Sequence, residues 1–182
     1  MDSKPFATLF DIIFRELAFG SPDPDERTFV LNRGDRGLLA SLDRISAAEA
    51  SMAQAGDASI AAHVDHLRYG MSLLNLWGSG AAPPWPVMDW TASWKRNVVS
   101  EAEWRKLRDD LKREADAWAQ TLRTPRNVNE TEAGWMAGSV AHLAYHLGAI
   151  RQIHRATRGP TAEDEAKAEA NLRREASEKG TA

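Results

Sequence analysis

The amino-acid sequence predicts an all-α fold, a four-helix bundle with an additional N-terminal helix and a polar C-terminal tail. Three observations support this prediction. Apolar residues recur at helical spacing through most of the chain, whereas the alternation typical of strands is almost absent. Breaks rich in proline and glycine separate the helical stretches, and a capping-box pattern opens one of them. The chain of 182 residues also has the length of one domain.

Three helical stretches are predicted in the N-terminal half. Residues 4–18 form the additional helix, which ends where two prolines follow Ser21. Residues 36–53 form the second stretch and residues 60–77 the third, for which Ser59 is a candidate N-cap. The inward-facing residues of the first two are Phe6, Phe10, Ile13, Phe14 and Leu17, and then Leu38, Leu39, Leu42 and Ile45.

A long irregular connection follows, over residues 78–97. It contains three prolines and the tryptophans Trp85, Trp90 and Trp94. A loop of this length in a small domain often lines a functional site, and the tryptophans could cover its mouth. Their plainer interpretation is that they plug the core, and the sequence favours it.

Two long helices are predicted in the C-terminal half. Ser100 and Glu103 form the capping box of the first, which stops near Thr124. The second runs from Thr131 to about Thr157 and is ended by a Gly-Pro pair. Residues 1–160 are therefore expected to form a single helical-bundle domain. Residues 161–182 are expected to form a polar tail, either a solvated helix or a frayed end.

The composition and charge of the chain limit the classes of function that it can have. A net charge of −3 gives no electrostatic reason to expect a nucleic-acid partner. The chain has no cysteine, so any metal must be held by His, Asp, Glu or water. The N-terminus does not resemble a signal peptide, and no stretch is apolar enough to cross a membrane. We therefore expect a cytoplasmic protein.

The most informative residues are His142 and His146. They lie four positions apart in the longest helix, so both imidazoles are on one side, one turn apart. This side belongs to an apolar face, and a buried imidazole needs partners for both nitrogens or a metal ion. Two core histidines bonded to carbonyls or carboxylates are an equally weighted alternative. The pair nevertheless points to a metal site better than it identifies a reaction.

A third ligand could come from His63 or His66 in the earlier helix, and their spacing alone does not choose between them. Three histidines with an open position are typical of a catalytic metal site. Asp65 is a possible partner for a ligand, although a solvated surface carboxylate is the more common case. His154 lies two turns beyond His146, too far for the same ion, and is expected to be structural or exposed.

Two motifs resemble the DinB-like (DinB/YfiT) superfamily of bacterial four-helix-bundle metalloenzymes. Residues 59–67 are similar to the segment that opens the family's second helix and ends in His plus an aliphatic residue. Residues 142–152 are similar to the family pattern His-x-x-x-His-x-Gly-Gln-Ile/Leu, except that Ala149 stands where glutamine is common. The resemblance covers about residues 33–157 and implies that His66, His142 and His146 are the metal ligands, with His63 as an extra histidine.

The resemblance further implies a divalent ion, Zn²⁺ or Ni²⁺, and a low-molecular-weight thiol as a possible cofactor. Relatives include thiol-dependent transferases and isomerases. Three neutral imidazoles leave the ion its full charge, which lowers the pKa of a bound water or thiol. The first hypothesis is therefore a metal-dependent transferase or hydrolase acting on a small molecule. No general base stands out, and Asp65 and Asp89 are weak candidates.

The alternative hypothesis is a non-catalytic bundle that binds a ligand or protein, with a structural metal or none. A homodimer is expected in either case, because the N-terminal helix is rich in phenylalanine and could leave an apolar surface exposed.

Overall fold

The computed structural model describes residues 4–21, 28–53, 58–81, 88–124 and 127–179. Over these ranges the regular structure is entirely helical, as predicted, and contains no strand. The elements are α1 (Lys4–Phe19), α2 (Gly37–Leu42), α3 (Ala47–Ala50), α4 (Ile60–Gly78), η2 (Ser93–Lys95), α5 (Glu101–Arg123), α6 (Glu130–Ile153), η3 (Arg155–Thr157) and α7 (Ala162–Lys179).

Three of the long helices, α4, α5 and α6, start at side-chain caps. Ser59 accepts a hydrogen bond from the Ala62 amide at the start of α4. The capping box predicted at Ser100 opens α5, and Asn129 forms another at the start of α6. These caps satisfy amides that the first helical turn leaves without a partner.

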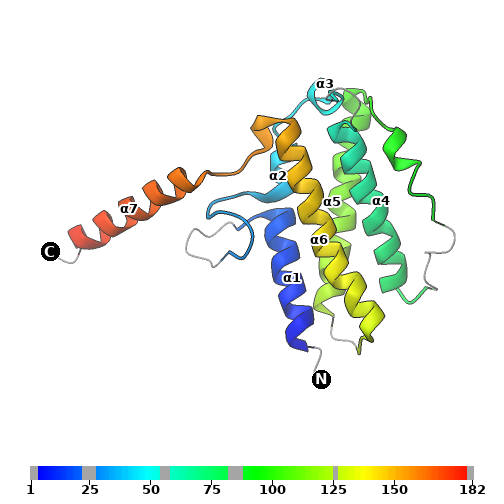
Figure 1. Cartoon of the computed structure of the whole chain (residues 1–182), viewed down its shortest axis with the longest axis horizontal. Coiled ribbons are helices and arrows are strands. Elements are labelled where there is room, and N and C mark those ends of the chain that lie inside the picture. The colour runs from blue at the N-terminus through cyan, green and yellow to red at the C-terminus, as the bar shows by residue number, and fades with distance from the viewer. Residues whose placement is uncertain (1–3, 22–27, 54–57, 82–87, 125–126, 180–182) are drawn as a thin grey trace.

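Four long helices pack side by side around the core (Figure 1). α4 contacts α5 and α6, and α1 contacts the same two helices from the other side. The largest fully buried side chains include Trp104 and Trp118 of α5, Leu143 of α6 and Phe14 of α1. This packing sets α4 against α6, which is the relationship that builds the candidate site.

The prediction that the N-terminal helix is an addition is wrong. Phe14, Leu17 and Ala18 of α1 are at most 1% exposed, and α1 packs against both α5 and α6. Its apolar stripe is therefore part of the core itself. Phe10 and Phe19 also pack on the core, whereas the placement of the Phe6 side chain lies outside what the structure describes. Among the α1 side chains that are described, the exposed large apolar ones are Leu9 and Ile12.

The single helix predicted over residues 36–53 is also wrong. The structure has two short helices there, α2 and α3, with a turn between them. Ser46 begins α3 with a capping box whose second member is Glu49. Both Leu42 and Ile45 remain buried, so the core positions were predicted although the helix is broken. A local side-chain cap here overrides the apolar periodicity.

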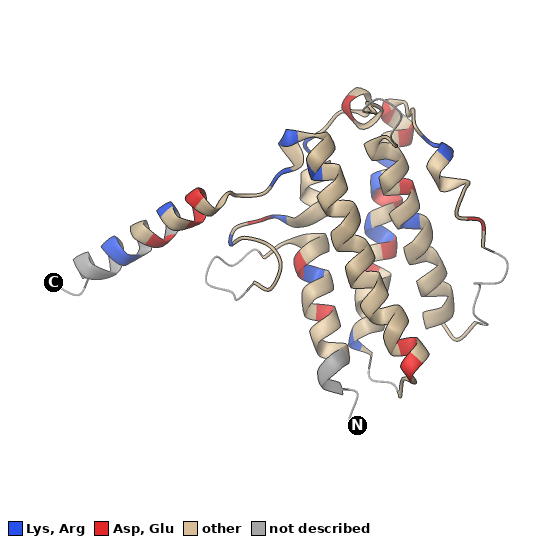
Figure 2. Cartoon of the chain, in the orientation of Figure 1, with Lys and Arg blue, Asp and Glu red and all other residues tan. Residues whose placement is uncertain are grey.

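The charged residues are unevenly distributed. Lys, Arg, Asp and Glu gather on α5 and α7, whereas α6 carries only Arg151 beyond its first turn (Figure 2). α7 extends away from the other helices (Figure 1), and most of its described side chains are exposed. The polar tail is thus helical from Ala162 to Lys179. In the described part of the chain, no helix combines the length and apolar character needed to span a membrane.

Candidate metal centre

Histidines from α4 and α6 meet in the interface between these helices. His66 and His146 are buried and His142 is half-buried, and each offers a ring nitrogen within 4.8 Å of those of the other two. The ring centroid of His66 lies 5.1 Å from that of His142 and 5.1 Å from that of His146. The structure thus brings together the three histidines that the sequence singled out.

A chain of close contacts links the histidines of α6 to the extra histidine of α4. His146 Nε2 lies 3.0 Å from His142 Nε2, and its Nδ1 lies 2.8 Å from His63 Nδ1. Each of these contacts is short enough for one proton, donated by one ring and accepted by the other. His63 is outside the three-histidine group but contacts one of its members.

His66 has a different partner, the Ser93 hydroxyl, at 3.1 Å from its Nδ1. Ser93 Oγ donates its own proton to the Trp90 carbonyl, at 3.0 Å. The hydroxyl therefore accepts from His66, whose proton is on Nδ1 and whose Nε2 presents a lone pair. This fixed tautomer is the one that a metal ligand binding through Nε2 requires.

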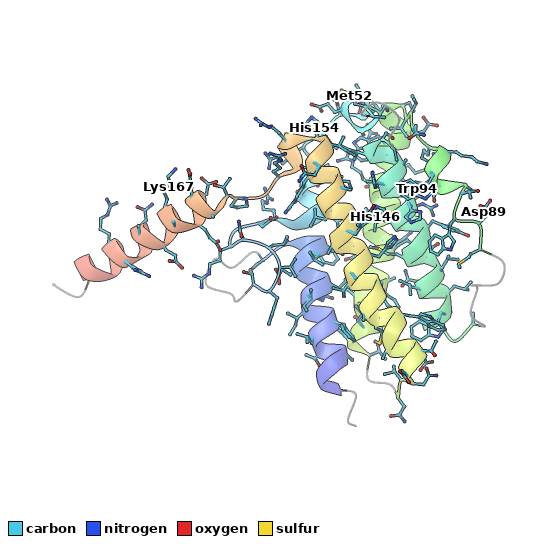
Figure 3. The ribbon with its side chains drawn as sticks, in the orientation of Figure 1. Met52, Asp89, Trp94, His146, His154 and Lys167 are labelled. Atoms are coloured by element: carbon cyan, nitrogen blue, oxygen red, sulfur yellow. The ribbon has the colours of Figure 1, made fainter. Side chains whose placement is uncertain are left out.

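Two tryptophans of the irregular connection cover His66. Trp94 stacks on its ring at a centroid distance of 4.3 Å, and Trp90 lies 5.3 Å away in a tilted arrangement. Trp94 also lies 5.7 Å from His146, and Figure 3 shows these two labelled residues close together. Both tryptophans are half-buried. They form walls of the site rather than plugs of the core, and Trp85 lies outside the described residues.

The two candidate bases have other roles. Asp65 is buried, with ion pairs of 2.7 Å to Arg68 and 2.8 Å to Arg96, so it is not the solvated carboxylate that was the more common expectation. Asp89 is exposed and accepts two hydrogen bonds from Thr91, which lower its pKa. Figure 3 shows Asp89 at the edge of the molecule. Neither environment favours proton abstraction at the histidines.

His154 is structural, as expected. It caps the C-terminus of α6, its Nδ1 accepts from the Ala156 amide, and its Nε2 lies 3.3 Å from a Glu49 carboxylate oxygen. It is therefore occupied at both nitrogens, away from the three-histidine group.

The surroundings keep the three imidazoles neutral. Burial, followed by the neighbouring His142 and His63, lowers the pKa of His66 to about 4. Burial, followed by the three neighbouring histidine rings, lowers the pKa of His146 to about 3. Burial also lowers the pKa of His142. Neutral imidazole is the form that binds a metal ion, so all three rings are ready to do so at neutral pH.

A cavity of about 500 Å³ borders the histidines. Its walls come from α4, α6 and the connection between α4 and α5. The lining residues are His66, Leu67, Gly70, Met71, Leu74, Trp90, Gly134, Trp135, Gly138, Ser139 and His142. Two of the three clustered histidines therefore face a space large enough for a small organic molecule.

Sequence reasoning missed two contacts of this site, those of Ser93 and His63. Ser93 lies between Trp90 and Trp94, in the connection singled out for its tryptophans, but no periodicity places its hydroxyl against His66. His63 was one of the two open choices on α4, and its contact with His146 depends on how α4 and α6 pack.

Comparisons of the chain with protein-family models, with curated proteins and with solved structures found no match. The function is therefore argued from the geometry of the histidines and the cavity.

Proposed function

We propose that the protein is a metal-dependent enzyme acting on a small molecule, with a divalent ion held by His66, His142 and His146. The observation that carries the proposal is that three neutral imidazoles converge, two of them, His66 and His142, at the border of a cavity of about 500 Å³. Three nitrogen ligands beside an accessible space are the arrangement of catalytic metal sites, whereas structural sites are closed by a fourth protein ligand.

The donor geometry supports an ion. Two nitrogens bound to one ion at about 2.1 Å lie about 3.0–3.4 Å apart for bond angles of about 90–109°. The Nε2 atoms of His142 and His146 are already 3.0 Å apart. The widest separation in the group is at most 4.8 Å, so ion binding would draw the rings together by about 1–2 Å.

Hydrogen bonds from residues outside the three-histidine group also suit a role for these histidines as metal ligands. Ser93 holds His66 in the tautomer that leaves Nε2 available. His63 can accept the Nδ1 proton of His146, which leaves the Nε2 of that ring available as well. Partners of this kind orient metal ligands and raise their basicity.

The chemistry follows from the charge of the ion. A divalent ion held by neutral imidazoles keeps its full charge, which makes water or a thiol acidic enough to react near neutral pH. We propose thiol transfer or hydrolysis as the reaction class and Zn²⁺ or Ni²⁺ as the ion, both of which accept imidazole. Trp90 and Trp94 exclude water from one side of His66, and the cavity beside His66 and His142 receives the substrate.

We also propose that the chain is a DinB-like four-helix bundle. The two histidine motifs fall on α4 and α6, and four long helices pack around one core, which supports the assignment. A cytoplasmic location and a small-molecule substrate go with this proposal.

A second candidate function is a metal-free binding module. One observation favours it: the contacts from His142 through His146 to His63 can be satisfied by protons alone. In that case the imidazoles form a buried polar network, and the cavity binds a ligand without catalysing a reaction.

Metal analysis distinguishes the two. Protein purified without a His tag should contain about one divalent ion per chain, and chelated protein should take up one Co²⁺ with a visible spectrum. His146→Ala should abolish uptake, whereas His154→Ala, a histidine occupied by Glu49 and Ala156, should not. Loss of uptake in both variants, or no stoichiometric uptake by the unmodified protein, would favour the binding module. A screen of electrophiles with different thiols then tests the reaction class.

A further inference from the structure

The cavity beside the histidines has a strongly unequal distribution of polar groups. Its aliphatic and aromatic walls are Leu67, Met71, Leu74, Trp90 and Trp135. Among the described residues that line it, none is Lys, Arg, Asp or Glu. A charged ligand would therefore lose its hydration without gaining a partner there.

Ser139 supplies the only side-chain hydroxyl among the described lining residues, and this hydroxyl already has two partners. Ser139 Oγ accepts from Trp118 Nε1 at 2.9 Å and donates to the Met136 carbonyl at 2.7 Å. Apart from the indole N–H groups of Trp90 and Trp135, the side-chain polar groups left for a ligand are at the end formed by His66 and His142.

Three glycines on two helices line the hollow, and Gly134 and Gly138 lie at its exposed side. A Cβ added to Gly134 or Gly138 of α6 would have no atom within 4 Å, so a side chain there would project into open space. A Cβ at Gly70 of α4 would lie 3.5 Å from the Trp90 ring and 3.7 Å from the His142 ring. Glycine is a poor residue for a helix interior, which makes three in this lining costly unless the space is used.

From this distribution we propose that the cavity selects neutral, largely apolar molecules, with an aromatic or aliphatic body and one donor or electrophilic group directed at the histidines. The inference rests on the proposed function, because it assigns the substrate class of the same site. The apolar walls bind the body of the molecule by burying it. The histidine end fixes its orientation, so that the reacting group approaches His66 and His142 rather than the glycines.

Three imidazole probes test this class on Co²⁺-loaded full-length protein. All three probes carry the same imidazole donor. Imidazole has no substituent, 4-phenylimidazole has an apolar substituent, and imidazole-4-acetate has a charged one. Dissociation constants come from changes in the visible spectrum. We expect 4-phenylimidazole to bind at least about tenfold more tightly than imidazole, because its ring is buried, and imidazole-4-acetate to bind no more tightly than imidazole.

Two glycines of α6, Gly138 and Gly148, supply a test variant and its matched control. Gly138→Leu fills the cavity and should bring the ratio of the imidazole and 4-phenylimidazole constants close to one. Gly148→Leu, on the same helix with equally open space but outside the cavity lining, should keep the tenfold ratio. Both variants exchange glycine for a good helix former, so neither should weaken α6.

The outcomes separate this inference from the proposed function. A protein that takes up no Co²⁺ would overturn both. A normal Co²⁺ spectrum with equal constants for imidazole and 4-phenylimidazole, or with tighter binding of imidazole-4-acetate, would overturn the substrate class alone. A ratio lowered equally by Gly138→Leu and Gly148→Leu would likewise show that the body of the probe lies elsewhere.

Discussion

His63 Nδ1 lies 2.8 Å from His146 Nδ1, so one histidine of α4 orients another on α6. The second nitrogen of His146 is directed at His142, 3.0 Å away. The position of a single proton between His63 and His146 thus decides whether the Nε2 of His146 is free to act as a ligand.

The first prediction concerns this contact. His63→Ala should weaken metal binding by about 10- to 100-fold, the usual effect of losing a partner of a ligand. His66→Ala should remove a ligand and weaken binding more. Titration of both variants with Co²⁺ measures the difference, with His154→Ala as the histidine control. A larger loss in His63→Ala would identify His63, not His66, as the α4 ligand.

The second prediction concerns Ser93. Ser93→Ala removes the hydroxyl that fixes the tautomer of His66 and should weaken metal binding by about tenfold. Ser72→Ala is the control, because its hydroxyl donates only to the Tyr69 carbonyl within α4. Equal affinity for Ser93→Ala and Ser72→Ala would mean that the Ser93 contact does not orient the ring.

The third prediction is that metal stabilises the fold. An ion that binds only the folded chain, at 100 times its dissociation constant, adds about 2.7 kcal/mol to the free energy of unfolding. For a chain of this size that raises the Tm by about 5–10 °C. Thermal unfolding with metal and with chelator measures the shift, which His146→Ala should abolish. A Tm that does not respond to metal in the unmodified protein would argue against the site.

The fourth prediction concerns pH and metal-free protein. Burial lowers the pKa of His66 to about 4 and that of His146 to about 3 in the folded chain, from a pKa of about 6.5 in the unfolded chain. Below pH 6.5 the unfolded chain therefore binds protons that the folded chain does not, and the free energy of unfolding falls as the pH falls. We expect a loss of about 1–2 kcal/mol between pH 7 and pH 5, after allowance for solvent screening.

Urea denaturation of chelated protein at the two pH values measures this loss. His66→Gln and His146→Gln each remove one titrating ring, so the loss should be smaller in both variants. Stability that is the same at pH 7 and pH 5 would show that the rings are charged or solvated when folded.

The fifth prediction is a two-fold dimer through α1. Leu9 and Ile12 are 37% and 42% exposed, and their spacing of three places them on one side of the helix. Light scattering at tens of micromolar should give twice the chain mass, and Leu9→Glu with Ile12→Glu should give a monomer. Leu76→Glu, an exposed apolar position on α4, should remain dimeric. A full-length protein that is already monomeric would exclude this interface.

Much of the fold was predictable because it follows from local rules. Apolar periodicity and the caps at Ser59 and Ser100 placed α4 and α5 closely. The break between α2 and α3 was missed, because the apolar spacing of Leu42 and Ile45 continues through the turn. The role of α1 was also missed: whether Phe14 faces a core or solvent depends on which helices pack against it, and no local pattern encodes that choice.

The candidate site, like the fold, was predictable where local spacing decides and not where tertiary packing decides. The spacing of four between His142 and His146 was enough to put both rings on one side of α6. The resemblance of residues 59–67 then favoured His66, and the structure brings its ring nitrogen within 4.8 Å of the other two. The contacts of Ser93 and His63 depend on tertiary packing. The cavity depends on it as well, because its lining residues come from α4, α6 and the connection between α4 and α5.

Asp65 connects α4 to the segment that contains Trp90 and Trp94. Its carboxylate is shared between Arg68, one turn along α4, and Arg96, just beyond η2. The backbone from Trp90 to Arg96 is thereby fastened to α4 immediately beside His66. If the segment lifted from the helix, the Asp65–Arg96 ion pair would break and Asp65 would keep only Arg68 as its partner. The Arg96 ion pair, the Ser93 hydrogen bond and the stacked Trp94 ring therefore hold this segment on α4 at three neighbouring points, while the cavity borders His66 and His142.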